Sequence, residues 1–386
     1  MISKNVKHIV KRASKYEKIA IVGLGRNGRE LYDFLDISDV QITHAFDNSL
    51  KLLGKTFKGV AIAKPYKVEG NCLYVITVAE KVYRCKLLQQ LVDLNIPESD
   101  IEIYYSIRDY DYMKTLDPEY YVEEVRDIFF ERFGYDLNVD NPRTYNEKIC
   151  VDKVCNRDPR KSLLADKYKV KDWVKQKIGA EYVVKSYGAW DDAFEIDFSM
   201  LPQSFVLKVN NASGHNIVVK DKSKIDREAV CKQLNEWLKE KFGYLLLELH
   251  YNDIQPKIIC DEYLEGLAEE VYDYNIYCFH GEPKYIWCIK GSHRENCQAA
   301  FYDTDWNKLD FEYGYPLDEE IAPRPTHLKE MLELSAKLSE EFKHVRVDWY
   351  NLPDGRVLFG EMSFTTWGGN FKIEPEEYDL LLGELI

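Results

Sequence analysis

The sequence of 386 residues contains no apolar run long enough to span a bilayer. Its first twelve residues mix charged with apolar side chains and lack the apolar core of a signal peptide, so we expect a short amphipathic helix there. The nine cysteines include no Cys-x-x-Cys pair, which argues against a zinc site and for reduced thiols. These absences predict a cytoplasmic protein without a transmembrane segment.

Basic clusters are also missing. The formal net charge is −14, and no basic patch along the chain offsets it, so we expect no nucleic-acid partner. Apolar residues make up 45% and charged residues 31%, which is an ordinary globular composition. A chain of this length can form two domains that each bury a core. The sequence makes no prediction about the oligomeric state.

We predict a first domain at residues 1–108. An apolar strand runs directly into Gly23-Leu24-Gly25-Arg26-Asn27-Gly28 and a helix follows, which is the setting that a Gly-x-Gly-x-x-Gly turn requires. Strands and helices then alternate, which predicts a small Rossmann-like, doubly wound parallel sheet. The predicted strands are Lys18–Val22, Val40–Phe46, Leu73–Val78 and Ile101–Tyr105, with helices at Arg29–Leu35 and Val82–Leu94.

The glycine turn leaves two interpretations open. Gly23, Gly25 and Gly28 are candidates for binding a nucleotide, with Asp47, at the end of the second predicted strand, as the ribose-binding acid. Alternatively, the same glycines allow close packing of helix on strand without any ligand. Nicotinamide chemistry would need a catalytic pair to accompany the turn, so we expect no redox role for this domain.

Residues 109–117 are polar and are predicted to link this domain to a second one at residues 118–386. Periodic apolar residues predict helices at Pro118–Phe133, Leu163–Val174, Ala229–Phe242 and Leu328–Phe342. Apolar stretches predict strands at Phe205–Val209, Ile217–Val219, Lys257–Gly266, Tyr272–Phe279, Lys284–Ile289, Val345–Tyr350 and Val357–Phe364.

The stretch Phe205–Lys220 is predicted to form a strand, a loop and a second strand. Lys208 interrupts the apolar run of the first strand, and a charge there needs a partner, such as a bound phosphate. The loop Asn210–His215 has small or polar residues and no obvious core residue, with Gly214 free to adopt positive φ, and its amides could fold over a polyphosphate. On these residues alone, an ordinary hairpin with Lys208 reaching solvent explains the pattern equally well.

The last two predicted strands carry a second group of polar residues. The turn Leu352–Gly355 suits type I, because proline stands second and glycine fourth. If this loop sets the register, Asp348 and Glu361 are diagonal neighbours on one face, about 7 Å apart at the backbone, and Ser363 shares that face. The opposite pairs expected from this register are Asn351–Arg356, Asp348–Phe359 and Arg346–Glu361.

Two carboxylates that converge in this way repel each other unless a cation lies between them. Magnesium ions that carry the phosphates of ATP would remove the repulsion. A surface Arg346–Glu361 pair beside a solvated Asp348 is the alternative. The presence of Lys208 and its loop favours the metal site.

A lysine on a strand, a loop of small residues, an acidic hinge and final strands with Arg-x-Asp and Glu follow one another in an order that resembles the ATP-grasp superfamily. The chain is most similar to the TupA-like (teichuronopeptide biosynthesis) ATP-grasp family of bacterial surface polysaccharide clusters. The resemblance covers roughly residues 118–386, so the whole chain is expected to be an α/β, Rossmann-like domain followed by an α+β ATP-grasp fold. The blocks that carry it are Asn141–Lys148, Leu164–Tyr168, Phe205–Lys208, Ser213–Asn216, Asp261–Leu264, Val345–Asp348 and Phe359–Glu361.

The resemblance implies a nucleotide site in the second domain. Lys208, together with Lys167 or Lys161, would hold the phosphates of ATP. Residues of the loop and of the acidic hinge would meet the remainder of the nucleotide, and they are Ser213, Gly214, His215, Asp261, Glu262, Tyr263 and Leu264.

The resemblance also implies a catalytic centre on the last two strands. Asp348 and Glu361 would bind magnesium, with Ser363 as the third ligand, where many ATP-grasp enzymes have asparagine. Arg346 would stabilise the oxygens of an acyl phosphate and of the tetrahedral oxyanion. Asp273 is a candidate for a base or for binding the amine, and a solvated hairpin residue is the alternative interpretation.

The implied reaction is an ATP-dependent ligation. A carboxylate attacks the γ-phosphate of ATP to give an acyl phosphate and ADP, and an amine then displaces phosphate to form an amide. The family points to a hexuronic acid in a capsular polymer or in its UDP-linked monomer, and to an amino acid or another small amine. The acidic net charge favours the monomer. A glycosyltransferase or sugar kinase-type transferase of the same pathway, and a non-catalytic sugar-nucleotide-binding scaffold, stay open as alternatives.

Overall fold

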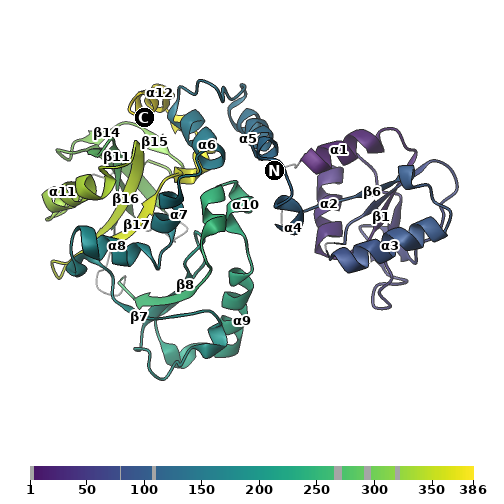
Figure 1. The fold of residues 1–386 in the computed structure, drawn as a ribbon, viewed down its shortest axis with the longest axis horizontal. Helices are drawn as coiled ribbons and strands as arrows, with labels where there is room; N and C mark the ends of the chain where they lie inside the picture. The colour runs from purple at the N-terminus through teal and green to yellow at the C-terminus, as the bar shows by residue number, and fades with distance from the viewer. Residues whose placement is uncertain (1–3, 79, 107–109, 265–271, 291–296, 318–321) are drawn as a thin grey trace. The chain divides into compact units, whose positions relative to one another are not determined.

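The structure is a computed structural model that describes residues 4–78, 80–106, 110–264, 272–290, 297–317 and 322–386 (Figure 1). Contacts within the chain divide it into two units, Met1–Leu116 and Asp117–Ile386. All nine cysteines are free thiols. No helix among the described residues combines the length and the apolar character that crossing a membrane requires.

The first unit contains a six-stranded sheet in the order β3-β4-β2-β1-β5-β6. Neighbouring strands pair in parallel, except that β3 and β4 are antiparallel. The predicted doubly wound sheet is therefore confirmed. The strands are β1 (Lys18–Val22), β2 (His44–Phe46), β3 (Thr56–Phe57), β4 (Val60–Ala63), β5 (Cys72–Ile76) and β6 (Ile101–Ile103), and the helices are α1 (Lys4–Ala13), α2 (Arg26–Ile37), α3 (Lys81–Asp93), η1 (Glu98–Asp100) and α4 (Tyr110–Met113).

Helices cover both faces of this sheet. α1 and α2 bury Val6, Ile9 and Leu31 against one face, and α3 buries Leu87 and Leu91 against the other. β1 lies between β2 and β5, so its side chains contribute to both cores. The carboxyl end of β1 therefore holds the glycine turn at the centre of the unit.

Two segments of this sheet differ from the prediction. The strand expected from Val40 begins only at His44, because Thr43 contacts the backbone of Ile19 through its hydroxyl instead of continuing a regular ladder. The β3–β4 hairpin was not predicted, since its strands are too short to show an apolar pattern. Its turn residues Lys58 and Gly59 have φ values of 50° and 86°, the geometry that fits a tight hairpin.

The second unit contains a four-stranded antiparallel sheet in the order β7-β10-β8-β9 and a six-stranded antiparallel sheet in the order β14-β13-β12-β11-β16-β17. This is the expected ATP-grasp architecture. The strands of this unit are β7 (Ser186–Trp190), β8 (Phe205–Val209), β9 (Asn216–Val219), β10 (Ile258–Glu262), β11 (Tyr272–Phe279), β12 (Glu282–Lys290), β13 (Gln298–Asp303), β14 (Lys308–Leu309), β15 (Glu312–Tyr313), β16 (His344–Asn351), β17 (Val357–Ser363) and β18 (Ile373–Glu374). Its α-helices are α5 (Pro118–Phe133), α6 (Tyr145–Cys155), α7 (Pro159–Ala165), α8 (Val170–Lys177), α9 (Arg227–Leu238), α10 (Phe242–Leu246), α11 (Leu328–Ser339) and α12 (Glu377–Glu384), and its 3₁₀ turns are η2 (Ala180–Tyr182), η3 (Ala193–Glu195), η4 (Lys222–Lys224), η5 (Leu249–Asp253) and η7 (Thr366–Gly369).

The six-stranded sheet is covered on both faces. On one face α11, which lies beside β16 in Figure 1, buries Met331 in the same core as Val347. On the other face α6 buries Tyr145 against β11 and β12. Because side chains alternate along a strand, Arg346 and Asp348 lie on the face opposite to Val347. The polar residues of β16 are thus held within a largely buried layer.

The four-stranded sheet follows the same rule. Phe205, Leu207 and Val209 of β8 pack with Leu234 of α9 in one apolar core. Lys208 has the opposite orientation by alternation, so it is excluded from this core and lies on the other face of the sheet. The apolar pattern of the strand therefore fixes the side on which its single lysine acts.

The helix predicted over Leu163–Val174 is in fact two helices, α7 and α8, so this prediction is wrong. The chain turns at Asp166, whose Oδ1 accepts hydrogen bonds from the amides of Tyr168 and Lys169 and from Nδ2 of Asn210. A short aspartate side chain competes with the helix for backbone donors and so interrupts it. The break leaves the intervening residues outside both helices.

Candidate active site

The final hairpin, β16–β17, does not have the predicted register. Leu352 donates its amide to the carbonyl of Arg356, and Gly355 adopts a left-handed φ of 88°. The turn therefore contains one residue more than expected, as in a type I turn followed by a bulge. The pairs nearest the turn are Asn351–Val357, Tyr350–Leu358 and Trp349–Phe359, in place of the expected Asn351–Arg356 and Asp348–Phe359.

A second irregularity between Val347 and Trp349 shifts the pairing once more. Arg346 therefore lies opposite Ser363, and the predicted Arg346–Glu361 pairing is wrong. A single one-residue shift would move a carboxylate to the other face, but two successive shifts restore the original alternation. The side chains expected on one face consequently still share it.

Four charged side chains meet on this face. The guanidinium of Arg346 donates from Nε to Asp348 Oδ1 over 2.7 Å and from Nη2 to Asp348 Oδ2 over 2.6 Å. The same Nη2 lies 3.4 Å from Glu361 Oε1, and Nζ of Lys167 lies 3.2 Å from Glu361 Oε2. The side chains of Arg346 and Asp348 are only 11% and 13% exposed, so solvent screens their charges weakly.

The two carboxylates differ in their electrostatics. Burial raises the pKa of Asp348 to about 7; Arg346 opposes this shift and Glu361 adds to it. Burial also acts to raise the pKa of Glu361, but Lys167 and Arg346 outweigh it, and this pKa is lowered overall. Lys208 contributes to that lowering, so its charge acts on β17 from the other sheet.

Asp348, Glu361 and Ser363 offer oxygen donors, which are the ligands that magnesium prefers. The two carboxylates are close enough to share one guanidinium nitrogen, and a divalent cation would neutralise both. No group of three or more His, Cys, Asp or Glu residues in the described part of the chain could hold a metal. Ser363 lies opposite Arg346 on the neighbouring strand and shares the face that carries both carboxylates.

The second centre of charge lies on the four-stranded sheet. Lys208 lies diagonal to Asp261 of β10, and its Nζ is 2.9 Å from Asp261 Oδ2. The other oxygen, Oδ1, accepts hydrogen bonds from the Ser186 hydroxyl over 2.7 Å and from the ammonium of Lys171. Burial acts to raise the pKa of Asp261, but the two lysines outweigh it and lower this pKa overall.

Sequence reasoning missed Lys171 and Ser186. In the sequence, Lys171 is notable only because it follows Lys167 by four residues, a spacing that would place both lysines on one face of a helix. The chain breaks between α7 and α8, so the two lysines do not belong to one helix. Ser186 begins β7, a strand whose five residues carry little apolar pattern. Only the pairing of β7 with β10 brings this serine to Asp261.

The structure places Asp261, and not Glu262, beside the lysine of β8. Glu262 has the opposite orientation on β10 and accepts hydrogen bonds from both terminal nitrogens of Arg356, at 3.0 and 3.1 Å. Beyond it, Tyr263 is half-buried and Leu264 is buried. The hinge is thus tied to the turn of the final hairpin.

The loop after β8 differs from the expectation that it holds no core residues. Asn210–Ala212 are buried, and Asn210 donates a hydrogen bond to Asp166, so this part of the prediction is wrong. His215 is also anchored, since its Nε2 lies 3.0 Å from Glu240 Oε2. Only Ser213 and Gly214 of this loop are exposed. The freely accessible backbone is therefore shorter than the sequence indicates.

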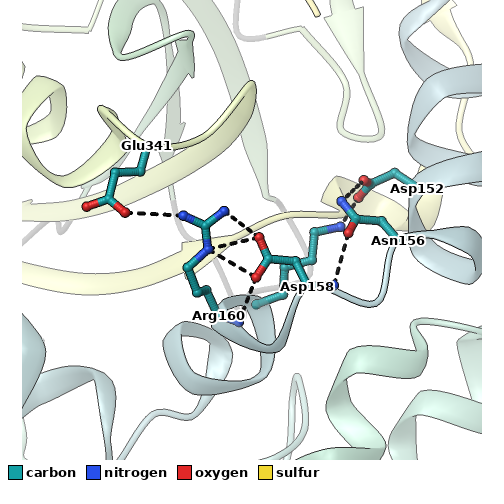
Figure 2. A network of polar contacts seen from close by, with 6 residues as sticks. Asp152, Asn156, Asp158, Arg160 and Glu341 are labelled. Carbon is teal, nitrogen blue, oxygen red and sulfur yellow. Dashed lines mark hydrogen bonds and ion pairs between the residues drawn. The ribbon is translucent and has the colours of Figure 1, made fainter.

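The two alternative phosphate lysines are in different places. Lys161 pairs with Asp152 and lines a pocket of roughly 750 Å³. In the same pocket Arg160 pairs with both Asp158 and Glu341, as Figure 2 shows. These charges are therefore compensated within their own cluster, whereas Lys167 contacts Glu361 of β17.

Two further carboxylates lie near the centre. Asp273 lies on β11. Its charge also raises the pKa of Asp348, although burial, Arg346 and Glu361 each have a larger effect. Residues 265–271, which precede β11, lie outside the described residues. Glu248, which sequence reasoning missed, is buried and accepts a hydrogen bond from Thr365. Burial raises the pKa of Glu248. The sequence gave no sign of this residue, because the segment around it is irregular and shows no periodic apolar pattern.

In the first unit, the glycine turn is tightly packed. A Cβ on Gly28 would collide with the carbonyl oxygen of Gly23, and a Cβ on Gly23 would lie 2.7 Å from Val78 Cγ2. Gly25 is exposed, with nothing within 4 Å of the position of a Cβ. Packing therefore accounts for two of the three glycines.

Asp47 takes part in the same turn. Its Oδ2 accepts the amide of Leu24 over 2.7 Å, and its Oδ1 accepts the amide of Ser49 over 2.7 Å. Both oxygens thus already accept hydrogen bonds from the backbone of this unit. The position expected for a ribose-binding acid has a structural use in closing the turn.

One antiparallel sheet carries Lys208, and the other carries Arg346 and a pair of carboxylates that Lys167 contacts from the break between α7 and α8, which is the arrangement expected of an ATP-grasp protein. A model of the TupA-like ATP-grasp family matches residues 147–386, which is more than half of the chain. The chain therefore belongs to the TupA-like ATP-grasp family, and the resemblance seen in the sequence is confirmed.

Solved structures of ligases are also similar. A D-alanine–D-alanine ligase from Bacillus anthracis complexed with ATP is 13% identical, with 90% of this chain and 86% of that chain covered and a TM-score of 0.33. An L-amino acid ligase from Bacillus licheniformis is 10% identical, with 91% and 69% covered and a TM-score of 0.31. At this similarity the matches concern the fold alone. No curated protein matches the chain in sequence.

Proposed function

We propose that this ATP-grasp ligase joins a carboxylate to an amine, and that the carboxylate belongs to a hexuronic acid used in bacterial capsular or surface polysaccharide. The observation that carries the proposal is the convergence of Arg346, Asp348, Glu361 and Lys167 on one face, with Lys208 acting on the same group from the other sheet. ATP and a carboxylate are both anions, and they can react only where fixed cations offset their repulsion.

Each side chain has a role in this proposal. Lys208 and Lys167 bind the phosphates of ATP. Asp348 and Glu361 hold magnesium with the Ser363 hydroxyl, and the ion, when bound, neutralises phosphate charge.

The chemistry has two steps. The substrate carboxylate attacks the γ-phosphorus, the bond to ADP breaks, and an acyl phosphate forms. A neutral amine then attacks the acyl carbon, the bond to phosphate breaks, and the amine loses a proton. Arg346 donates hydrogen bonds to the charge that develops on the acyl oxygens. Asp273, on the same sheet, is proposed to receive the proton or to bind the amine.

The substrate assignment rests on the family and on charge. A UDP-linked hexuronate is favoured over a polymer, because a protein of net charge −14 repels a polyanion more strongly than a monomer. The amine is a small amino acid or amino alcohol, and the reaction takes place in the cytoplasm. We propose no redox role for the glycine turn of the first unit.

The decisive experiment supplies ATP, magnesium, a UDP-hexuronate and a pool of amines, and follows nucleotides and sugar products together by mass spectrometry. ADP, phosphate and a sugar amide are expected, and all three should require both the carboxylate and the amine. Release of AMP, or a stable phosphosugar that forms equally well without amine, would contradict the proposal.

A further inference from the structure

Asp261 is a buried carboxylate that forms ion pairs with two lysine ammonium groups. It is 2% exposed, and Lys171 and Lys208 both lie within ion-pair distance of it. Two lysines facing one carboxylate leave one positive charge uncompensated in this cluster. Such an excess is unfavourable in a buried position unless an anion arrives to balance it.

The two contacts are not equivalent. Lys171 and Ser186 both donate hydrogen bonds to Asp261 Oδ1, and the side chain of Lys171 is 12% exposed. Lys208 approaches Oδ2 at 2.9 Å, and the side chain of Lys208 is 27% exposed. Lys208 is therefore the more exposed of the two ammonium groups and the one with access to a ligand.

If Lys208 turned toward a phosphate, Asp261 would lose one of its two counter-charges. A buried carboxylate without a partner is strongly destabilising, so Lys208 would stay on Asp261 unless another cation remained there. Lys171 is that cation, since its hydrogen bond to Oδ1 does not involve Lys208. We propose that Lys171 is a positioning residue that neutralises Asp261 and thereby frees Lys208 to bind the phosphates of the nucleotide. This inference rests on the proposed use of ATP.

The test is a double-mutant cycle read by calorimetric binding of a non-hydrolysable ATP analogue with magnesium, which requires neither acceptor substrate. Lys171→Met should weaken binding by about tenfold or more, because Lys208 becomes the only counter-ion of Asp261. Adding Asp261→Asn to Lys171→Met should recover affinity up to that of Asp261→Asn alone, because the amide no longer holds Lys208, and the single variant accounts for any contact of Asp261 itself with the nucleotide. Lys175→Met, on an exposed residue of the same helix, is the matched control and should bind like the wild type.

Lys171→Gln keeps a hydrogen-bond donor for Asp261 but removes the charge, so it should bind as weakly as Lys171→Met and serves if the methionine variant does not fold. Lys171→Arg should bind nearly normally. Wild-type affinity in a folded Lys171→Gln variant, while the wild type itself binds the analogue, would overturn the inference and leave the proposed function intact. A double variant that binds clearly more weakly than Asp261→Asn alone would also overturn it, because it would mean that Lys171 acts directly on phosphate or only on the fold. Absence of binding by the wild type would instead contradict the proposed function, and the inference with it.

Discussion

The glycine turn of the first unit and the charged cluster of the second both look like nucleotide sites in the sequence, but their polar groups are used differently. In the turn, Asp47 accepts two backbone amides and Gly28 packs on Gly23. In the cluster, Asp261 is shared by two lysines, and Arg346 contacts two carboxylates. The difference teaches that a fold can satisfy the polar groups of a motif by itself, whereas groups that compete for partners retain capacity for a ligand.

Replacement of Asp348 or Glu361, the two carboxylates proposed to bind magnesium, should cause the largest loss of activity. Asp348→Asn and Glu361→Gln should each lower magnesium-dependent ADP release by about 10³-fold or more, because the charge that holds the cation is lost. Asp354→Asn, on the exposed turn of the same hairpin, is the matched control and should retain activity. Thermal unfolding close to that of the wild type would show that the variants are folded. Undiminished turnover in either folded variant would contradict the proposal that these two carboxylates bind magnesium.

Arg346 provides the next largest effect. Arg346→Lys keeps the charge but loses the planar fork that contacts Asp348 through two nitrogens, so kcat should fall by about 10²-fold. Steady-state kinetics with ATP and the acceptors should show this loss. Arg356→Lys removes a similar two-nitrogen contact to Glu262 elsewhere on the hairpin and should leave kcat within a few-fold. Equal losses in both variants would show that the hairpin, and not the charge at its active face, was disturbed.

The glycine turn should respond in stability and not in catalysis. Gly28→Ala should lower the free energy of unfolding of the first unit by about 1–3 kcal/mol, because its Cβ meets the Gly23 carbonyl. Gly25→Ala should change that free energy little, since its Cβ would meet nothing within 4 Å. Denaturant unfolding followed by hydrogen exchange measures both. If Gly25→Ala instead abolished nucleotide-sugar binding without loss of stability, the turn would be a ligand site.

The exposed tip of the loop after β8 should show the smallest change, a difference in protease sensitivity when nucleotide binds. Ser213 and Gly214 are predicted to be cleaved by protease without nucleotide and to gain about a few-fold protection with a non-hydrolysable ATP analogue, because bound phosphates would order their amides. Limited proteolysis with mass mapping of the cuts would show this. Cleavage at equal rates with and without the analogue would argue that the loop plays no part in nucleotide binding. The buried segment Asn210–Ala212 should resist cleavage in both conditions.

Local sequence patterns predicted the elements that carry the site, but not how their ends pair. Alternation along β16 was sufficient to place Arg346 and Asp348 on one face. The predicted register of the hairpin was wrong because Gly355 extends the turn and because the pairing shifts again between Val347 and Trp349. Neither feature has a signature beyond a single glycine, since a bulge depends on how the two strands twist against the sheet. The predicted face was nevertheless correct, because two shifts of one residue add up to a shift of two, which returns each side chain to its original face.

Contacts between distant segments were beyond local patterns. Nothing near Lys171 in the sequence indicates Asp261, ninety residues later, and their contact depends on the break at Asp166 that redirects α8. The choice between Lys161 and Lys167 was open for the same reason. Both follow α6 closely, and only packing places one against Asp152 and the other against Glu361.

The sequence by itself determined the two-unit α/β and α+β architecture and the family, because apolar periodicity and ordered motifs are properties of short segments. It also determined which strand faces carry charge, since side chains alternate with a period of two. Only the tertiary structure decided which charges share partners and which are already satisfied. That distinction depends on burial and on distances between segments far apart in the chain, where a buried charge is strongly coupled to its neighbours and an exposed one is not.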